Sequence, residues 1–421
     1  MSNENGAFSH IKRGFPVSAV WFGALVGPSL LSGGYAVVYL CPYGAWGVIL
    51  PLLMEIPICI LAAMSASIVA KNKTYDYYSL GKVVYGKLYK IMMPFLDYYI
   101  IVAFITGGAA VANIEGSIGA QAFGCSEVVG AIIFGIITVF IITCGPKLMR
   151  TFSSISMPIM TVGFIALGII IITHAGDSLG NILADEWVPF EGHNLGVGVW
   201  NILVLGMSNL ATTFGSLCAI EQKIRNGKDA TGIAVCSFIM NSFLFIMLAL
   251  MILPYCPEAL EQAQPTVWLI NTALAKDFPW LVTFYMYFMF LVLLTSDAPQ
   301  CNAIIARIME RMAKSKKRKK KFDPNNRKQR LIAIWVIGMI YEGVCITVAQ
   351  VGLINIFSIG YSICGYLGII CCAVPTVIYF FRYMVGKNRK PIPIIEGVND
   401  HLAEESKARA EELKAAGKLA E

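Results

Sequence analysis

The chain has 421 residues, of which 57% are hydrophobic and 14% are charged, and its formal net charge is +7. Soluble domains carry about 25% charged residues, so this composition excludes an ordinary soluble protein and predicts an all-α integral membrane protein. The 12 cysteines show no CxxC spacing and no Cys/His pattern that would hold a transition metal.

Residues 1–15 are predicted to form a cytoplasmic N-terminus, and residues 16–40 the first membrane span. The centre of this span, "GALVGPSLLSGGYAVV", contains Pro28 together with several glycines. Proline removes a helix hydrogen bond, and a freed backbone group in hydrocarbon costs several kcal/mol unless it finds a partner. The sequence therefore predicts a helix that breaks inside the membrane. A simple proline kink, or small residues that let helices pack closely, is the alternative.

Further apolar runs of about 20 residues predict nine more spans. They lie at 46–70, 91–117, 127–145, 150–174, 195–219, 230–254, 279–306, 331–349 and 361–384. The predicted transmembrane domain is therefore 16–384, with repeats at about 16–174 and 195–350 followed by the final spans. A basic cytoplasmic loop at 307–330 and a cytoplasmic C-terminal tail at 385–421 complete the chain.

Positive charge indicates the orientation, because Lys and Arg concentrate in cytoplasmic loops. With ten spans, 32 of the 33 Lys and Arg residues fall on one side, and only Lys276 falls on the other. We therefore expect a multi-pass protein of the plasma (inner) membrane with both termini in the cytoplasm. The run "KSKKRKKKF" at 314–322 is interpreted as part of this pattern rather than as a nucleic-acid site, although a patch for anionic lipid is an alternative.

The sixth predicted span, 195–219, also has an interrupted centre. Because the first span starts inside and the sixth starts outside, the two halves form a five-plus-five inverted repeat with discontinuous helices 1 and 6. Two interrupted spans at corresponding positions are typical of a transporter binding site, where freed N–H and C=O groups hold the solute and its coupling ion. The predicted substrate-binding residues are Gly27, Ser29, Ser32, Gly33, Gly34, Ser208, Asn209, Thr212 and Thr213.

The eighth span contains three adjacent oxygen-bearing side chains, Thr295, Ser296 and Asp297. Together with backbone carbonyls near Ala24 and Gly27, they predict a site for a hard cation. In the alternative interpretation, the hydroxyls bond back to their own helix. No lysine lies in the middle of the fifth span to replace such a cation by its own charge, which favours Na⁺ over H⁺ as the coupling ion.

Three further acids, Glu55, Asp97 and Glu342, lie within predicted spans. Ionisable residues inside a membrane are functional candidates by default, so these are candidate coupling acids. Each could instead join two helices through hydrogen bonds.

The patterns "GALVGPSLLSGGY…YGAWG", "TGGAAVANIEGSIGAQAFG…VVG" and "GYSICGYLGIICCAVP" resemble the YkvI-like membrane proteins. This bacterial group lies within the amino acid–polyamine–organocation transporter superfamily. The resemblance covers nearly all of 14–385 and implies the LeuT-type fold, with substrate at the unwound parts of spans 1 and 6. It also implies that the backbone of 24–27 with Thr295 and Ser296 matches the common sodium site. The chain departs from the group after "SG", where Gly34-Tyr35 replaces a polar Gln-Glu pair.

These patterns predict a cation-coupled secondary transporter of a small organic solute, such as an amino acid or amine, with Na⁺ as the favoured cation. The alternative is a nutrient-sensing receptor on the same fold that binds without transporting. An enzyme is not expected, because none of the four histidines lies mid-span and no Ser/His or metal constellation is present. Expected partners are the solute and membrane lipids, with no nucleic acid and no cofactor other than the coupling ion.

Overall fold

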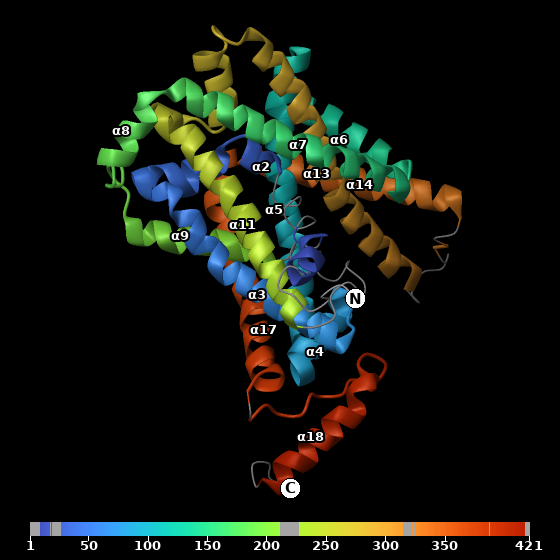
Figure 1. Cartoon of the computed structure of the whole chain (residues 1–421). Coiled ribbons are helices and arrows are strands. Elements are labelled where there is room, and N and C mark those ends of the chain that lie inside the picture. Colours follow the sequence, from blue (N-terminus) through green and yellow to red (C-terminus); the bar gives the residue numbers. More distant parts are fainter. Residues whose placement is uncertain are drawn as a thin grey trace.

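The computed structural model describes residues 9–16, 18, 27–210, 227–314, 322–323, 326–386 and 388–416. All regular secondary structure in these residues is helical (Figure 1). Seven helices are long and apolar enough to cross a membrane, and three shorter apolar helices, Ala36–Val48, Glu127–Thr143 and Leu195–Ser208, occur in the remaining predicted places. The predicted all-α membrane fold is confirmed.

The helices of the first half cover five predicted spans. They are α2 (Pro28–Leu31), a π-helical turn (Ala36–Leu40) that continues as a 3₁₀ helix (Cys41–Val48), α3 (Leu50–Asn72), α4 (Tyr77–Tyr85), α5 (Tyr89–Phe123), α6 (Glu127–Thr143) and α7 (Pro146–Ala175). A short 3₁₀ turn, Gly86–Leu88, joins α4 to α5.

The second half begins after α8 (Asp177–Asp185). Its helices are α9 (Leu195–Ser208), α11 (Gly227–Ile252), α12 (Pro265–Leu269), α13 (Pro279–Lys314), α14 (Arg327–Ala349), α15 (Leu353–Asn355), α16 (Tyr361–Gly368), α17 (Val374–Tyr379) and α18 (Ala403–Ala415). The tenth span alternates α15, α16 and α17 with π-helical turns at Ile356–Gly360, Ile369–Ala373 and Phe380–Met384.

Three predicted boundaries differ from the observed helices in an informative way. The first span does not end at Leu40 but continues to Val48, because the 3₁₀ segment accommodates Pro42 at its start. The second span accordingly begins at Leu50 rather than at residue 46. At the other end of the chain, α13 extends to Lys314, eight residues beyond the predicted limit of 306, because its polar last turns remain helical outside the apolar run.

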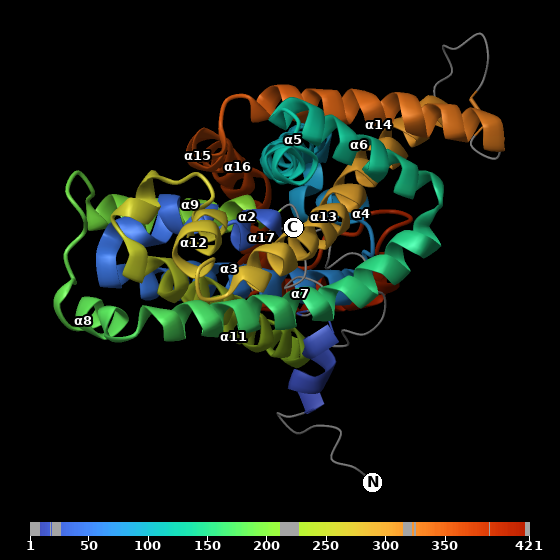
Figure 2. The same ribbon diagram turned by 90° about the horizontal axis from the view of Figure 1, so that it is seen from above.

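The spans pack in two groups. In the first group, α3 packs against both α11 and α9; in the second, α5, α6, α13 and α14 pack against one another. Figure 2 shows the second group gathered on one side of the bundle, with α7 running past both groups. Glycines bring α5 and α6 together, since a Cβ on Gly119 would lie 2.6 Å from the Cα of Gly130. Such small-residue contacts replace the hydrophobic driving force that lipid does not provide.

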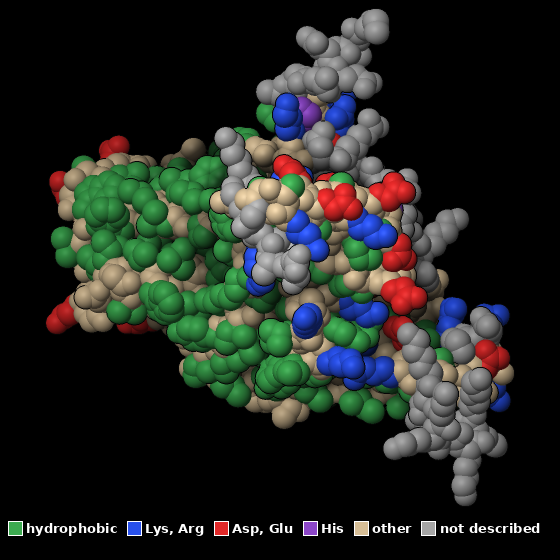
Figure 3. Space-filling view, turned by 90° about the horizontal axis from the view of Figure 1, so that it is seen from below, with side chains coloured by type: hydrophobic (Ala, Val, Ile, Leu, Met, Phe, Trp, Pro, Cys, Tyr) green, Lys and Arg blue, Asp and Glu red, His purple; other side chains and the backbone are tan. Residues whose placement is uncertain are grey.

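The two described terminal segments lie at the same end of the bundle. Near the N-terminus, His10 Nδ1 lies 2.7 Å from Asp229 Oδ1 at the start of α11, and Ser18 donates a hydrogen bond to the carbonyl of Ile233. The C-terminal tail contacts the last residues of α3, which runs antiparallel to α11. Figure 3 views this end and shows Lys, Arg, Asp and Glu side chains gathered on one part of it, beside a hydrophobic surface.

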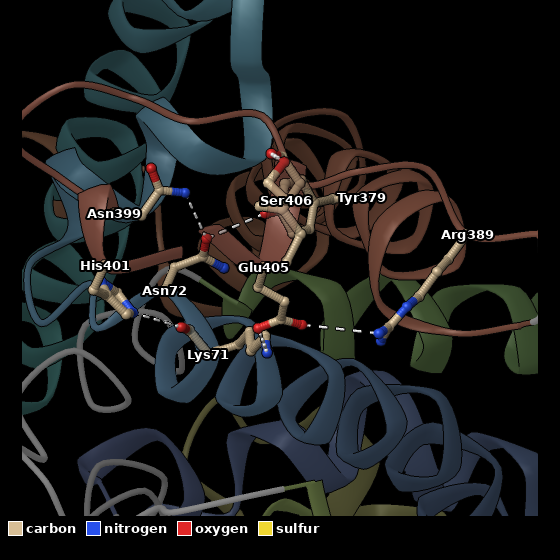
Figure 4. Close-up of polar contacts among 9 residues, drawn as sticks. Lys71, Asn72, Tyr379, Arg389, Asn399, His401, Glu405 and Ser406 are labelled. Carbon is tan, nitrogen blue, oxygen red and sulfur yellow. Dashed lines mark hydrogen bonds and ion pairs between the residues drawn. The ribbon is translucent and has the colours of Figure 1, made fainter. Parts of the chain in front are cut away.

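The C-terminal tail docks through a buried amide. Asn72, at the end of α3, accepts hydrogen bonds from Tyr379 (3.3 Å) in the tenth span and from the Asn399 amide (2.9 Å) in the tail. Around it, Lys71 pairs with Glu405 of α18 at 2.5 Å, and a His401 ring nitrogen lies 3.1 Å from the Lys71 carbonyl (Figure 4). One polar cluster therefore joins α3, the tenth span and the tail.

Replacing Asn72 tests this docking. In Asn72→Leu, the hydroxyl of Tyr379 and the amide of Asn399 lose a buried partner, at a cost of about 1–3 kcal/mol for each group left unsatisfied. We expect a lower melting temperature in detergent and faster proteolysis within 388–416. Lys414→Ala, at an exposed position on α18, is the control. Equal cleavage rates in the two variants would contradict the docking role of Asn72.

Candidate functional site

The first span is interrupted in the described residues. After α2 ends at Leu31, Ser32 and Gly33 form a turn, and the helix resumes at Gly34. Gly33 has φ of +84°, a left-handed conformation that other residues adopt only at a cost. A Cβ there would also lie 2.6 Å from the Thr266 hydroxyl oxygen. The break thus depends on glycine for both backbone conformation and close packing.

Elements outside the first span satisfy the carbonyls freed at the break. The Leu31 carbonyl accepts a hydrogen bond of 3.1 Å from the hydroxyl of Tyr285 on α13, and the Ser32 carbonyl accepts one of 3.0 Å from the backbone N–H of Thr266 on α12. Unpaired, each carbonyl would cost several kcal/mol in a membrane interior. The break is therefore held by two separate elements, one a span and one a short helix between spans.

Aromatic side chains surround the resumed helix. The ring of Tyr35 lies 4.9 Å from that of Phe357, 5.7 Å from that of Tyr361 and 6.1 Å from that of Phe245, measured between centroids. Gly34 permits this approach, because a Cβ on it would lie 2.2 Å from the Phe357 ring. These aromatic residues were not predicted to belong to the site. Their positions on three different spans gave no sequence signal that they meet.

The sixth span is described only up to residue 210, so most of its predicted break lies outside the described residues. Ser208 is buried and its backbone carbonyl accepts a 2.9 Å hydrogen bond from the hydroxyl of Tyr99, while the Asn209 amide donates to the Leu205 carbonyl. Of the other predicted substrate and ion residues, Gly27 accepts hydrogen bonds from the N–H groups of residues 30 and 31. Thr212, Thr213 and Ala24 lie outside the described residues, and the side chain of Ser29 is likewise not described.

The structure does not direct the side chains of Thr295 and Asp297 to one point. The Thr295 hydroxyl donates to carbonyls of its own helix, at 3.0 Å to Leu291 and 2.9 Å to Val292, and lies beside Met160 of α7. The Asp297 carboxyl is buried on another side of α13, where it faces α6 and α14. Adjacent helix positions differ by about 100°, so the first and third of three consecutive residues point in nearly opposite directions.

Two of the candidate coupling acids have protein partners. Glu55 on α3 accepts hydrogen bonds from the Asn241 amide on α11 at 3.2 Å and from the Cys59 thiol. Asp97 on α5 forms ion pairs with two arginines of α13, one of them Arg311 at 2.8 Å and the other Arg307. These contacts join helices, as the alternative interpretation of such acids expects.

The third candidate acid, Glu342, belongs to a group of three buried acids whose proximity was not predicted from the sequence. Glu342 on α14, Asp297 on α13 and Glu115 on α5 are all at most 2% exposed and interact electrostatically with one another. We call these three residues the carboxyl cluster. Glu115 was missed, although an acid in an apolar run is the same signal that identified Glu55 and Glu342.

A surface groove of about 510 Å³ lies between α3, α9 and the tenth span. Its lining is apolar, with Ile60, Met64, Leu203 and Val377 among its residues. It offers no polar group that would orient a charged or zwitterionic solute. The break at Ser32–Gly33, with its polar backbone and aromatic neighbours, is therefore the better candidate for a solute site.

Solved transporter structures share this fold. A Na⁺-coupled sialic acid symporter in its substrate-bound, outward-open state has a TM-score of 0.58 at 11% identity, over 87% of this chain and 78% of that chain. MhsT in complex with L-phenylalanine has a TM-score of 0.53 at 16% identity, over 89% of both chains. A mutant of the manganese transporter of Eremococcus coleocola has a TM-score of 0.58 at 13% identity, over 97% and 86%. No protein-family model and no curated protein matches the sequence.

These likenesses confirm the predicted LeuT-type fold and establish nothing beyond it, because the identities are low. The more specific YkvI-like resemblance stays a prediction. The three similar structures are a sialic acid symporter, a complex with L-phenylalanine and a manganese transporter, so the fold does not determine the substrate.

The break itself can be tested through Gly33. In Gly33→Ala, the new Cβ meets both a positive φ and the side chains of Thr266 and Pro265. Backbone strain of this kind costs about 1–3 kcal/mol, so we expect a clearly lower melting temperature of the purified protein. Gly180→Ala in α8, where a Cβ meets nothing within 4 Å, should leave it unchanged or higher. Equal melting temperatures for both variants would show that the turn at Gly33 is not constrained as described.

Proposed function

We propose that the chain is a cation-coupled secondary transporter of a small organic solute, such as an amino acid or amine, that works by alternating access. The observation that carries this proposal is the break at Ser32–Gly33 within a membrane span. It puts backbone polar groups where lipid cannot satisfy them, and they are paired instead with α12 and α13. Such pairs can be exchanged for contacts with a solute.

The solute is proposed to lie between the broken first and sixth spans. Backbone N–H groups at a helix start attract a carboxylate, and freed carbonyls attract an amine or a cation. The proposed substrate-binding residues are the predicted ones, Gly27, Ser29, Ser32, Gly33, Gly34, Ser208, Asn209, Thr212 and Thr213. To these we add the ring of Tyr35, since its aromatic neighbourhood suits the apolar part of an organic solute.

Alternating access is proposed to arise from relative motion of the two packed groups of helices. The first and sixth spans would move with α3 and α11, which Glu55 and Asn241 join by a buried hydrogen bond. The other group, α5, α6, α13 and α14, would stay together, with Asp97 tying α5 to α13 by ion pairs. As predicted from the charge pattern, both termini would face the cytoplasm.

The coupling cation is proposed to be Na⁺ or H⁺, with different residues responsible for each. A Na⁺ site would use the backbone near Ala24 and Gly27 with Thr295 and Ser296, and the Na⁺ coupling of the similar sialic acid symporter supports this choice. The Thr295 hydroxyl could keep donating to its own-helix carbonyls, because its oxygen lone pairs would still be available to the cation. An H⁺ site would use buried acids instead.

A nutrient-sensing receptor is the second candidate. The observation in its favour is the docked tail, because α18 contacts α3 directly and could report a change in the bundle to another protein. Solute binding without flux would favour this function.

Transport is tested with purified protein in liposomes. A thermal-shift screen of amino acids and amines, with and without Na⁺, first identifies a stabilising solute. We then expect its radiolabelled form to accumulate in proteoliposomes under an inward Na⁺ or H⁺ gradient, and not in empty liposomes. Stabilisation by a solute that never accumulates under either gradient would contradict transport and support the receptor.

The Na⁺ site has a separate test. If Thr295 and Ser296 bind Na⁺, the double variant Thr295→Ala/Ser296→Ala should lose the Na⁺ dependence of solute affinity, because both hydroxyl ligands are removed. Thr347→Ala is the matched control, since its hydroxyl also donates to its own helix but at an exposed position. Unchanged Na⁺ dependence in the double variant would exclude these residues as ligands.

A further inference from the structure

The carboxyl cluster is deep within its helices. Glu115, Asp297 and Glu342 each lie at least seven residues from either end of α5, α13 and α14. They are 1%, 1% and 2% exposed, respectively. Gly135 of α6 allows one of them close approach, since a Cβ there would lie 3.2 Å from the Cβ of Glu342. The three acids thus meet in the interior of the second helix group.

Four of the six carboxyl oxygens of the cluster make no hydrogen bond of normal geometry, although Asp297 interacts with Thr138 and Glu342, and Glu342 with Cys301. These four are both oxygens of Asp297, and Oε1 of both Glu115 and Glu342. Glu55 and Asp97 behave differently, because an amide and two arginines satisfy them. Acids that served only to join helices would be expected to bond as those two do.

A hydroxyl group provides an independent sign of a ligand. Thr138 of α6 is fully buried and interacts with the Asp297 carboxyl, although its oxygen makes no hydrogen bond of normal geometry within the protein. A buried hydroxyl whose hydrogen bonding is incomplete destabilises the fold unless a further group completes it. Thr138 adds to the cluster a group that can donate to a carboxylate and accept from a carboxylic acid.

The three acids of the cluster cannot all be ionised at once, because no positive charge near them among the described residues compensates three negative charges. The other titratable groups that face it are Cys301 on α13 and Tyr341 and Cys345 on α14, all uncharged in their usual state. Among the groups that act on the three acids in the described part of the chain, none is a Lys, Arg or His. A buried unpaired charge costs several kcal/mol even after relaxation, and like charges add to that cost. Protonation of the acids removes this cost.

We propose that the carboxyl cluster is a proton-binding site, and that the protons it holds are the cations moved with the solute. A proton adds to a carboxylate oxygen to give a neutral acid, and its release re-forms the carboxylate. A metal ion is disfavoured as the ligand, since no group of three or more acidic, His or Cys side chains in the described residues is arranged to hold one. The transport role rests on the proposed function, whereas the proton binding does not.

Infrared difference spectroscopy tests proton binding without transport. We expect wild-type protein at neutral pH to show a protonated-carboxyl C=O band that is partly lost in Glu342→Gln, Asp297→Asn and Glu115→Gln. It should shift in Thr138→Val, which keeps all three acids and changes the group facing Asp297. Glu258→Gln, at an exposed position, is the control. A band unchanged in all three acid variants would overturn the proposal.

Transport in proteoliposomes tests coupling. With an inward H⁺ gradient and no Na⁺, we expect faster solute uptake by wild type and loss of this stimulation in Glu342→Gln, while the solute still raises its melting temperature. Uptake driven only by Na⁺, and unaltered in Glu342→Gln, would overturn the coupling role and leave the proposed function intact. Solute binding without flux, together with the protonated band, would overturn the proposed function and support the proton site.

Discussion

A polypeptide inside lipid must pair its backbone polar groups within the protein. At the break in the first span, this requirement falls on two carbonyls. The carbonyls of Leu31 and Ser32 have no helical partner, and they bond instead to Tyr285 of α13 and Thr266 of α12. Each pair spares several kcal/mol. Hydrogen bonds from α12 and α13 therefore hold the two carbonyls in place. The turn at which these carbonyls lie depends on Gly33. The proposed solute site is arranged around these two hydrogen bonds.

Much of the fold follows from the sequence because its signals are local. Runs of apolar residues and the alternation of Lys and Arg predicted ten spans, and Pro28 with its neighbouring glycines predicted the break. The extension of the first span to Val48 was not predictable from composition. A 3₁₀ segment containing Pro42 and a Gly44 with φ of +60° continues an apolar run without a normal helix pattern. The contact of α12 with the break is also a tertiary fact without a sequence signal.

The candidate site was less predictable because side-chain direction and partners decide it. Thr295 and Asp297 are two positions apart, and a helix turns them some 200° away from each other. This rule was available from the sequence once the eighth span was taken as continuous. The partners of the buried acids could not be predicted from the sequence. Asp97 and Glu342 look alike in an apolar run, yet the first meets arginines and the second meets other acids.

The buried amide at the end of α3 has a thermodynamic consequence. Asn72 bonds at once to Tyr379 of the tenth span and to Asn399 of the tail. If the separation of α3 and the tenth span changes between conformational states, the stability of the docked tail must change with it. Linkage is reciprocal: a protein that captured the undocked tail would shift the equilibrium of the bundle, and any molecule that favoured one bundle state would alter that protein's affinity by the same factor.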